Sequence, residues 1–250
     1  PDTRFQKALL LYGTGANGKS IVINTIMHIL GQDYTSTVTL NDLQNNRFAA
    51  SQLVGKLLNV SSETVNYTGA ELDKFKAIVG GDPVSIERKG VDGDTATLCA
   101  RLLFASNTFP RSGDQTIGGY RRWIIIPFDK YFSPEDADTR LQDKLDKELP
   151  GILNWCLEGL KRLYENDEFS FIDQGLIDQM IYDNDNVVRF LEECCIITNN
   201  DDDTIPTSTL YRKYADWTSL ENSKPVGKTE FGRRLARKFD RGRTENTRFY

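Results

Sequence analysis

The first 130 residues alternate between short apolar runs and wider, helix-like apolar spacings. The short runs predict strands at 8–12, 57–61, 84–87, 97–105 and 122–128. The wider spacings predict helices at 18–30, 41–50 and 70–79. Strands that alternate with helices favour a parallel sheet covered by helices, with ligands at the carboxyl ends of the strands. We therefore expect an α/β fold.

The helix predicted at 70–79 carries signals at both of its ends. Thr68 and Glu71 have the spacing of a capping box. Gly80 and Gly81 are typical of a helix C-terminus, and Pro83 prevents continuation.

A helical pattern follows from Glu135 to about Asn166, and Pro150 and Gly151 interrupt it. Its apolar stripe consists of Leu141, Leu145, Leu149, Ile152, Leu153, Cys156, Leu157, Leu160 and Leu163. We expect four parts: a core at 1–134, its helical extension at 135–166, an acidic linker at 167–185 and a C-terminal domain at 186–250.

The C-terminal domain has helical patterns at 186–196, 208–219 and 228–239, and a short strand at 247–250. Three short helices with a basic third helix are compatible with a helix-turn-helix or winged-helix domain that contacts duplex DNA. A small bundle that docks another protein or mediates oligomerisation fits equally well. Both interpretations stay open.

Composition places the chain among ordinary globular proteins, with 39% hydrophobic and 27% charged residues. No apolar run approaches the roughly 18 residues of a membrane span, and no secretory signal is present. We expect a cytoplasmic protein without a membrane contact. Because the chain begins at Pro1 and its first strand follows within ten residues, we also expect a fragment of a longer protein.

Charge is distributed unevenly along the chain. The net charge of −5 argues against a generic nucleic-acid coat. Residues 161–203 hold three basic and twelve acidic residues, whereas 221–250 hold nine basic and four acidic residues. The C-terminal excess of basic residues indicates a local anionic partner.

Cysteine and histidine do not suggest a metal site. Cys99, Cys156, Cys194 and Cys195 form no C-x-x-C pair, so we expect reduced thiols in the core. His28, the single histidine, follows a glycine loop in a predicted helix, where a structural role is expected.

The strongest chemical signal is a run of eight residues after the first predicted strand. Gly13, Thr14, Gly15, Ala16, Asn17, Gly18, Lys19 and Ser20 fit G-x-x-x-x-G-K-[ST] at every fixed position. A strand before it and a helix after it are the context that supports a phosphate-binding loop. In such a loop Lys19 reaches the β- and γ-phosphates of ATP and the Ser20 hydroxyl ligates Mg²⁺. The alternative is a glycine-rich turn.

Polar residues end two later strands. Glu63 follows the strand at 57–61, where an acid can hold the Mg²⁺ shell and activate water. Asn107 comes just after the strand predicted at 97–105. An amide at this strand end can position water and sense the γ-phosphate, although an asparagine of an ordinary turn is also compatible. Glu63 and Asn107 are therefore candidate catalytic residues.

Two basic pairs add further candidates. Arg121 and Arg122 precede the last strand and can supply an arginine finger, which acting in trans requires a ring of subunits. Surface salt bridges are the alternative. Arg88 and Lys89 lie at or near a predicted hairpin tip with Gly90 and Asp92-Gly93, where they can meet a phosphate backbone.

The order of these motifs resembles the superfamily III helicase domain of phage and plasmid primase-helicases, a family with satellite-phage and poxvirus members. The motifs are G-x-G-x-N-G-K-S, V-S-S-E, K-x-x-x-G-G-D-P-V, F-A-S-N-x-x-P and G-G-Y-R-R-W-x-x-x-P-F. The similarity covers residues 8 to about 165 and extends more loosely to the C-terminal domain.

This resemblance implies an AAA+-like P-loop ATPase that assembles into a ring, usually a hexamer, and moves single-stranded DNA through a channel. It implies Walker A roles for Lys19 and Ser20, Walker B for Glu63, a sensor role for Asn107 and a finger at Arg122, with Arg121 as the fallback. Lys89 matches the DNA-contacting hairpin of the channel. Ser62 stands where many Walker B motifs have a second acid, so Glu71 or Asp73 is an alternative helper. No primase part is visible in this chain.

Three functions remain to be separated. The first is an ATP-dependent DNA helicase of phage or plasmid replication. The second is a DNA-binding initiator or regulator whose ATPase only switches assembly, and the third is a small-molecule kinase. A switch hydrolyses ATP without separating strands, and a kinase shows no stimulation by DNA.

Overall fold

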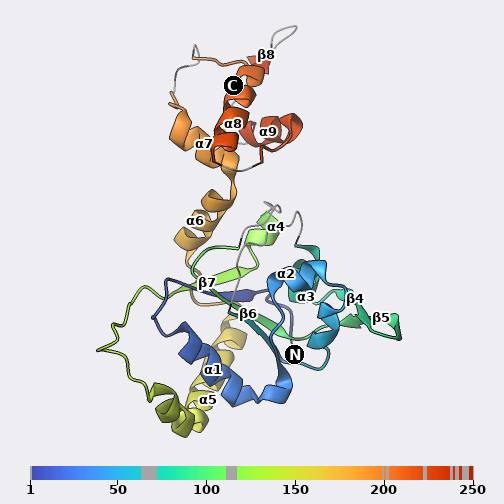
Figure 1. Cartoon of the computed structure of the whole chain (residues 1–250), viewed down its shortest axis with the longest axis vertical. Helices are drawn as coiled ribbons and strands as arrows, with labels where there is room; N and C mark the ends of the chain where they lie inside the picture. The colour runs from blue at the N-terminus through green and yellow to red at the C-terminus, as the bar shows by residue number, and fades with distance from the viewer. Residues whose placement is uncertain are drawn as a thin grey trace. The chain divides into compact units, whose positions relative to one another are not determined.

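The computed structural model describes residues 2–62, 72–110, 117–198, 200, 203–221, 224–236, 239, 242–243 and 248–249. The chain forms two compact units, Pro1–Met180 and Ile181–Tyr250 (Figure 1). Each unit is described by itself.

The first unit is built on a five-stranded parallel sheet in the order β2-β3-β6-β1-β7. Its strands are β1 (Ala8–Tyr12), β2 (Thr35–Ser36), β3 (Leu58–Ser61), β6 (Arg101–Ser106) and β7 (Trp123–Pro127). The predicted α/β core with a mostly parallel sheet is confirmed. The single strand predicted at 97–105 is wrong, because β6 begins at Arg101 and Thr97 ends a separate strand.

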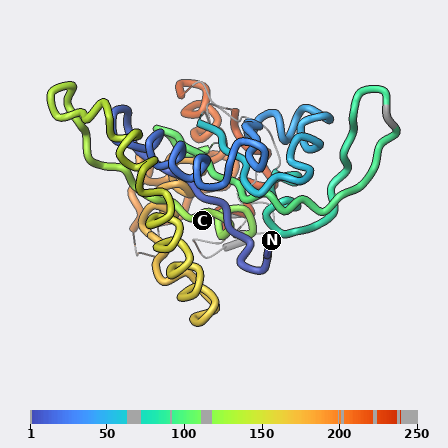
Figure 2. The backbone as a smooth tube through the Cα atoms, turned by 90° about the horizontal axis from the view of Figure 1, so that it is seen from below, coloured from blue at the N-terminus to red at the C-terminus, as the bar shows by residue number. Residues whose placement is uncertain are grey.

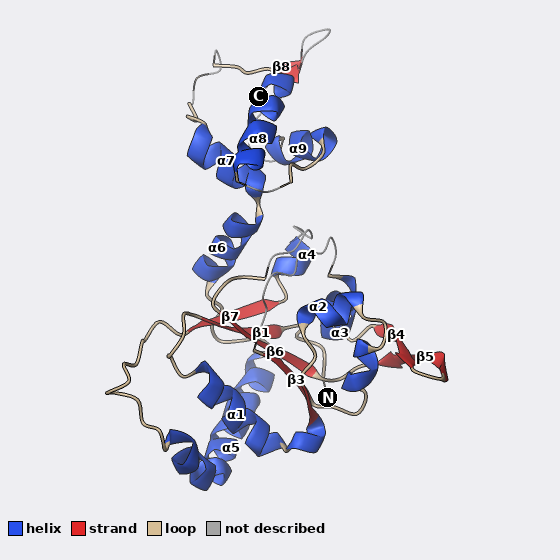
Figure 3. Cartoon of the chain, viewed as in Figure 1, coloured by secondary structure: helices blue, strands red, loops and turns tan. Residues whose placement is uncertain are grey.

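Helices cover both faces of this sheet (Figure 3). On one face α1 (Lys19–Leu30) packs Ile23 into a cluster with Leu11, Val60 and Leu103. Ile23 is 5% exposed, whereas its neighbour Val22 is 39% exposed on the outer side of the helix.

The other face is covered by α3 (Asp73–Gly80), which buries Phe75. The Phe75 ring stacks on Trp123 at 4.7 Å and lies 6.4 Å from Phe104, centroid to centroid. Gly81 ends α3 in the left-handed conformation, as predicted. The predicted capping residues Thr68 and Glu71 lie outside the described residues.

The helix predicted at 41–50 is two shorter elements. Helix α2 (Leu40–Asn45) is capped by Thr39, whose hydroxyl accepts a hydrogen bond from the Asp42 N–H. A 3₁₀ helix, η2 (Ala49–Leu53), follows, and another, η1 (Gln32–Tyr34), precedes β2.

A two-stranded antiparallel hairpin of β4 (Pro83–Arg88) and β5 (Val91–Thr97) projects from the first unit (Figure 2). Arg88 pairs with Val91, so Lys89 and Gly90 make the turn. Gly90 has a φ of 77°, which favours glycine. Asp92 and Gly93, expected at the tip, lie within β5 instead.

Helix α4 (Ile117–Tyr120) precedes β7, and the long helix α5 (Leu141–Asn166) lies beside α1. The prediction that Pro150 interrupts this helix is wrong, because α5 is continuous through it. None of the residues of the apolar stripe on α5 is buried. A water-exposed helix can leave the carbonyl opposite a proline to solvent, which lowers the cost of the lost hydrogen bond.

His28 has the predicted structural contact, because its Nδ1 lies 2.7 Å from an Asp146 oxygen on α5. This hydrogen bond, with a second from Gln142, lowers the pKa of Asp146. His28 thus joins α1 to α5.

Helix α6 (Gln174–Asn184) occupies part of the segment expected to be a linker, and the boundary between the units falls within it. The second unit contains α7 (Asn186–Cys194), α8 (Thr207–Leu220), α9 (Lys228–Leu235) and the strands β8 (Gly242–Arg243) and β9 (Arg248–Phe249). Its core is aromatic, and Tyr214 and Phe231 stack at 4.7 Å.

Two expectations about cysteine and membranes can be checked on the described part of the chain. Cys156 and Cys194 are exposed, so the prediction that all four thiols lie in the core is wrong. Within the described ranges, no three His, Cys, Asp or Glu side chains gather to hold a metal. Among those same residues, no helix combines the length and the apolar character that crossing a bilayer requires.

Candidate functional site

The loop Gly13–Ser20, which we call the cradle, lies between β1 and α1 at the carboxyl edge of the sheet. The Gly13 N–H donates to the Ser106 carbonyl at the end of β6, and the Phe128 N–H donates to the Tyr12 carbonyl. The cradle therefore lies at the end of β1, beside the ends of β6 and β7, its neighbours in the sheet. That position is the usual ligand crevice of an open parallel sheet.

The entrance of the cradle is too tight for any side chain. A Cβ atom at Gly13 would lie 2.4 Å from the Phe128 carbonyl oxygen and 2.7 Å from the Asn17 Nδ2. Its φ of 153° also favours glycine. The first glycine of the motif is thus required by close approach of another backbone segment.

Lys19 is held inside the cradle by three oxygens. Its Nζ donates to the Gly13 carbonyl at 2.7 Å, the Thr14 carbonyl at 2.8 Å and the Asn17 Oδ1 at 2.9 Å. Burial lowers the pKa of Lys19. The ammonium is therefore placed at the centre of the loop, surrounded by acceptors that a phosphate can replace.

Asn17 braces the cradle from the side and is 7% exposed. Its Nδ2 donates to the Phe128 carbonyl at 2.8 Å, while its Oδ1 accepts from Lys19. Thr14, Gly15 and Ala16 remain exposed at the rim. Asn17, a variable position of the motif, thus fixes the loop against the segment that follows β7.

A cavity of about 330 Å³ opens beside the cradle. Ser20 and Asn24 of α1 line it, with Ser61 and Ser62 at the end of β3 and with Thr37 and Thr39 after β2. The structure therefore brings the Ser20 hydroxyl and the end of β3 to one cavity. Glu63 follows Ser62 directly, but it lies outside the described residues, as does Glu71.

Asn59 of β3, which the sequence analysis missed, fixes a segment that lines this cavity. It is fully buried, and its amide oxygen accepts from the Ser36 hydroxyl at 2.9 Å and the Val38 N–H at 2.8 Å. Its Nδ2 donates to the Val38 carbonyl at 2.9 Å. These bonds tie the segment that carries Thr37 to β3. The available signal was an asparagine within the apolar run at 57–60.

Asn107 lies at the same edge of the sheet as the cradle. It directly follows β6, the strand beside β1, and its side chain is exposed. Phe109 stacks on Tyr12 at 4.2 Å and holds this turn against the end of β1. Of the two predicted strand-end residues, Asn107 is the one that the structure describes, and it lies at the same edge of the sheet as the cradle.

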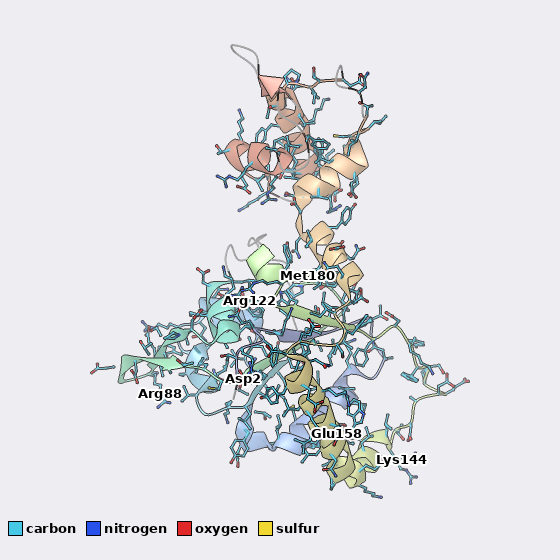
Figure 4. The ribbon with its side chains drawn as sticks, turned by 180° about the vertical axis from the view of Figure 1, so that it is seen from behind. Asp2, Arg88, Arg122, Lys144, Glu158 and Met180 are labelled. Atoms are coloured by element: carbon cyan, nitrogen blue, oxygen red, sulfur yellow. The ribbon has the colours of Figure 1, made fainter. Side chains whose placement is uncertain are left out.

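Arg121 and Arg122 are not brought to the cradle. They precede β7 at the amino edge of the sheet, and Trp123 pairs with Ala8 at the start of β1 (Figure 4 labels Arg122). Four residues of strand, about 13 Å, separate this edge from Tyr12. Arg121 donates to the Gln6 side chain at 2.8 Å, and the Arg122 guanidinium donates to the Gly118 carbonyl.

Arg88 and Lys89 are exposed at the turn of the β4–β5 hairpin, away from the cradle (Figure 4 labels Arg88). The prediction that both lie at the tip is confirmed. They can contact an extended anion there, but not a nucleotide in the cradle of the same chain.

The basic side chains of α9 in the second unit form ion pairs and a ring contact within that unit. Arg234 of α9 is 12% exposed and contacts Asp185 at 3.0 Å and Glu230 at 3.1 Å. Arg233 pairs with Glu230, and the Lys228 ammonium lies 5.6 Å above the Tyr211 ring. Arg234 therefore holds α9 to α7, whose N-terminus Asp185 caps.

The cradle and cavity together fit a phosphate-bearing ligand with a hard cation. The loop offers an ammonium and a helix N-terminus, which suit phosphate oxygens. The Ser20 and Ser62 hydroxyls offer oxygen ligands, which Mg²⁺ prefers.

Two family models match separate parts of the chain. Residues 11–122 match a family of unknown function, DUF5906, and residues 182–249 match the model described as Poxvirus D5 protein-like. The first match contains the cradle, and the second covers the second unit.

The chain is also similar to solved structures of the NrS-1 C terminal region. For the apo structure of that region, residues 305–718, the TM-score is 0.58, the identity is 13%, and the match covers 98% of this chain and 67% of that one. For its A form the TM-score is 0.53, the identity is 13%, and the coverages are 98% and 66%. This chain thus spans about two thirds of these structures, and the likeness is one of fold.

Proposed function

We propose that this chain is the ATP-dependent DNA helicase part of a primase-helicase-like replication protein of a phage or plasmid. The observation that carries the proposal is the cradle, with Lys19 at its centre and Ser20 facing the end of β3. Resemblance to superfamily III helicases, with an AAA+-like core, supplies the helicase assignment.

The comparisons support the same class of protein. The Poxvirus D5 protein-like match agrees with the resemblance to the poxvirus members of that family. The similarity to the NrS-1 C terminal region extends over nearly the whole chain. Both are compatible with a C-terminal helicase part of a longer protein.

In the proposed mechanism the cradle N–H groups and Lys19 hold the phosphates of ATP, and Ser20 with Glu63 would hold Mg²⁺. When bound, the ion would neutralise charge that develops on the phosphates. Glu63 accepts a proton from the attacking water, which Asn107 orients.

The arginine finger must come from a second copy. Arg122 lies at the amino edge of its own sheet, about 13 Å from the cradle edge. A head-to-tail contact between copies closes into a ring, here a hexamer, and brings one copy's Arg122 to the next copy's cradle. Single-stranded DNA then passes the Lys89 hairpins. Arg121 is the fallback finger.

Mixing two inactive variants tests this shared site. We expect Lys19→Ala and Arg122→Ala each to lower ATP hydrolysis by about a thousandfold or more. In an equal mixture, the Arg122→Ala cradle meets an intact finger from the Lys19→Ala chain. Roughly a quarter of wild-type hydrolysis should return, because one boundary in four is then complete.

An equal mixture of Lys19→Ala and Arg121→Ala tests Arg121 as the alternative finger in the same way. Return of activity only with the Arg121 variant would assign the finger to Arg121. No return in either mixture, with specific activity independent of protein concentration and of single-stranded DNA, would contradict the ring.

A DNA-binding initiator or regulator is the second candidate function. The observation that favours it is the separate core of the second unit, with three helices and the β8–β9 pair, compatible with a winged helix that contacts duplex DNA or a protein. A strand-displacement assay separates the two, since a switch binds DNA and hydrolyses ATP without separating strands.

A further inference from the structure

A second cavity, of about 210 Å³, lies in the first unit at the amino edge of the sheet. We call it the amino-edge pocket. Its wall includes Asp2, Phe5, Lys7, Arg101, Tyr164 and Phe169, with two leucines of α5 (Figure 4 labels Asp2). None of these residues has a role in the proposed ATP site.

One side of the amino-edge pocket is aromatic. The Phe5 ring lies 5.7 Å from Phe169 in an edge-on arrangement and 6.3 Å from Tyr164. The Arg4 guanidinium lies 4.8 Å above the Tyr164 ring. A hydrogen bond from the Gln6 N–H to the Thr3 carbonyl closes the turn that carries Arg4. The three rings are inclined to one another, at 31° for Phe5 and Tyr164 and 69° for Phe5 and Phe169, and together they form an apolar side on which a planar ligand can pack against a single ring.

The other side is cationic. Arg101 begins β6 and, like Leu103 two residues later, points to the sheet face covered by α1 and α5. Arg101 is half-buried, and within the described part of the chain its side chain forms no hydrogen bond or ion pair, although its charge, after that of Arg4, helps to lower the pKa of Asp2. Such a group retains five donors for a ligand.

Lys7 adds a second cation. Its Nζ donates one hydrogen bond, to the Arg121 carbonyl at 2.6 Å, which leaves two N–H groups. Burial and the charge of Arg121 lower the pKa of Lys7, so an anion beside it would be favourable. Asp2 is the acidic member of the wall, but Arg4 engages its carboxylate at 2.5 Å.

We propose that the amino-edge pocket binds one nucleotide, with its base against the aromatic wall and its phosphate on Arg101 and Lys7. A planar ring next to an anion matches the two sides of the wall. The volume is below that of usual ligand pockets, about 300–1,000 Å³, so a base enters and the phosphate stays at the mouth. A free mononucleotide and one unit of a single strand share this chemistry, and the choice of a strand unit rests on the proposed function.

Crosslinking in the Lys19→Ala chain tests this site without ATP hydrolysis. A fluorescein-labelled oligo(dT) carrying 5-iodouracil is titrated by anisotropy, irradiated and mapped by mass spectrometry. We expect crosslinks on Phe5, Tyr164 or Phe169. Arg101→Gln should weaken binding by about tenfold, the effect of one charge-assisted hydrogen bond.

The matched control is Arg162→Gln, which removes an exposed arginine on α5 outside the pocket. It should bind like the parent chain. Excess dTMP that displaces the probe assigns a free mononucleotide, whereas retention of the probe assigns a strand unit.

Crosslinks absent from all three rings, or equal affinities of the Arg101→Gln and Arg162→Gln chains, would overturn the proposal. If Arg101→Gln lowers the thermal midpoint, Phe169→Leu replaces it, since leucine keeps the apolar wall but removes the ring. Failure of this test leaves the mixing experiment on ATP hydrolysis unaffected, and failure of the mixing experiment leaves this one standing.

Discussion

The cradle and the β4–β5 hairpin each present a lysine for phosphate, but in opposite ways. Lys19 has three oxygens within 2.9 Å and a lowered pKa. Lys89 is exposed at a two-residue turn, and no residue of the described part of the chain bonds to it. One lysine is fixed before a ligand arrives, and the other keeps its side-chain freedom.

This difference indicates what each lysine can contribute. A fixed charge needs no ordering when a reaction begins, so it can stabilise a transition state strongly. A free surface lysine loses rotamer entropy on binding and is screened by salt, so its single contact is weak. We therefore expect ATP hydrolysis to depend on the cradle, and DNA affinity to depend on the hairpins of several chains acting together.

The largest effect should come from Lys19→Ala. Loss of a preorganised donor should lower kcat for ATP hydrolysis by about a thousandfold or more, and DNA unwinding should disappear. Phosphate release measured at saturating ATP checks this.

Lys56→Ala is the matched control, because the Lys56 ammonium also donates to a backbone carbonyl, that of Asp33, but at an exposed site. Its kcat should stay within about twofold of wild type. Equal kcat values for the two alanine variants would refute the phosphate role of the cradle.

A smaller effect separates the two glycines that shape these regions. Gly13→Ala places a Cβ 2.4 Å from the Phe128 carbonyl, whereas a Cβ at Gly90 meets nothing within 4 Å. Both positions have positive φ, so both variants lose about 1–2 kcal/mol to backbone strain. Gly13→Ala should lose a further 1–3 kcal/mol or so of unfolding free energy to the clash.

Urea unfolding of both variants measures this difference. ATP affinity should fall in the Gly13 variant alone, because the clash moves the cradle. If the two variants unfold at the same midpoint, the close approach of Phe128 to the loop is not a constraint in solution.

Much of the fold could be predicted because it depends on local sequence. The run at 8–12, the glycine loop and the following helix were predicted with nearly correct bounds, since burial on both faces makes β1 continuously apolar. The hairpin tip at Lys89 was predicted because Gly90 permits its turn.

The failures share a different physical cause. The apolar stripe of α5 shows which residues share one side of the helix, but burial depends on what packs beside that side, and none of the stripe residues is buried here. The edge on which Arg122 lies depends on the register of β7 against β1, which joins residues 115 apart. Asn59 was missed because its partners, Ser36 and Val38, are distant in sequence.

The smallest effect should come from Lys89→Ala. Since one exposed phosphate contact is weak, basal ATP hydrolysis should change by less than about twofold, and single-stranded DNA affinity should fall by roughly threefold per chain. The slope of log affinity against log salt should become shallower by about one unit. Unwinding, which needs every hairpin to hold DNA, should be lost.

Lys161→Ala removes an exposed lysine from α5 and serves as the control, with unchanged unwinding and salt slope. Normal unwinding by the Lys89 variant would remove the hairpin from the DNA path. A loss of basal hydrolysis instead would mean that the hairpin supports the cradle, and the contrast between a fixed and a free lysine would then fail, because Lys89 would have to be held in the working assembly.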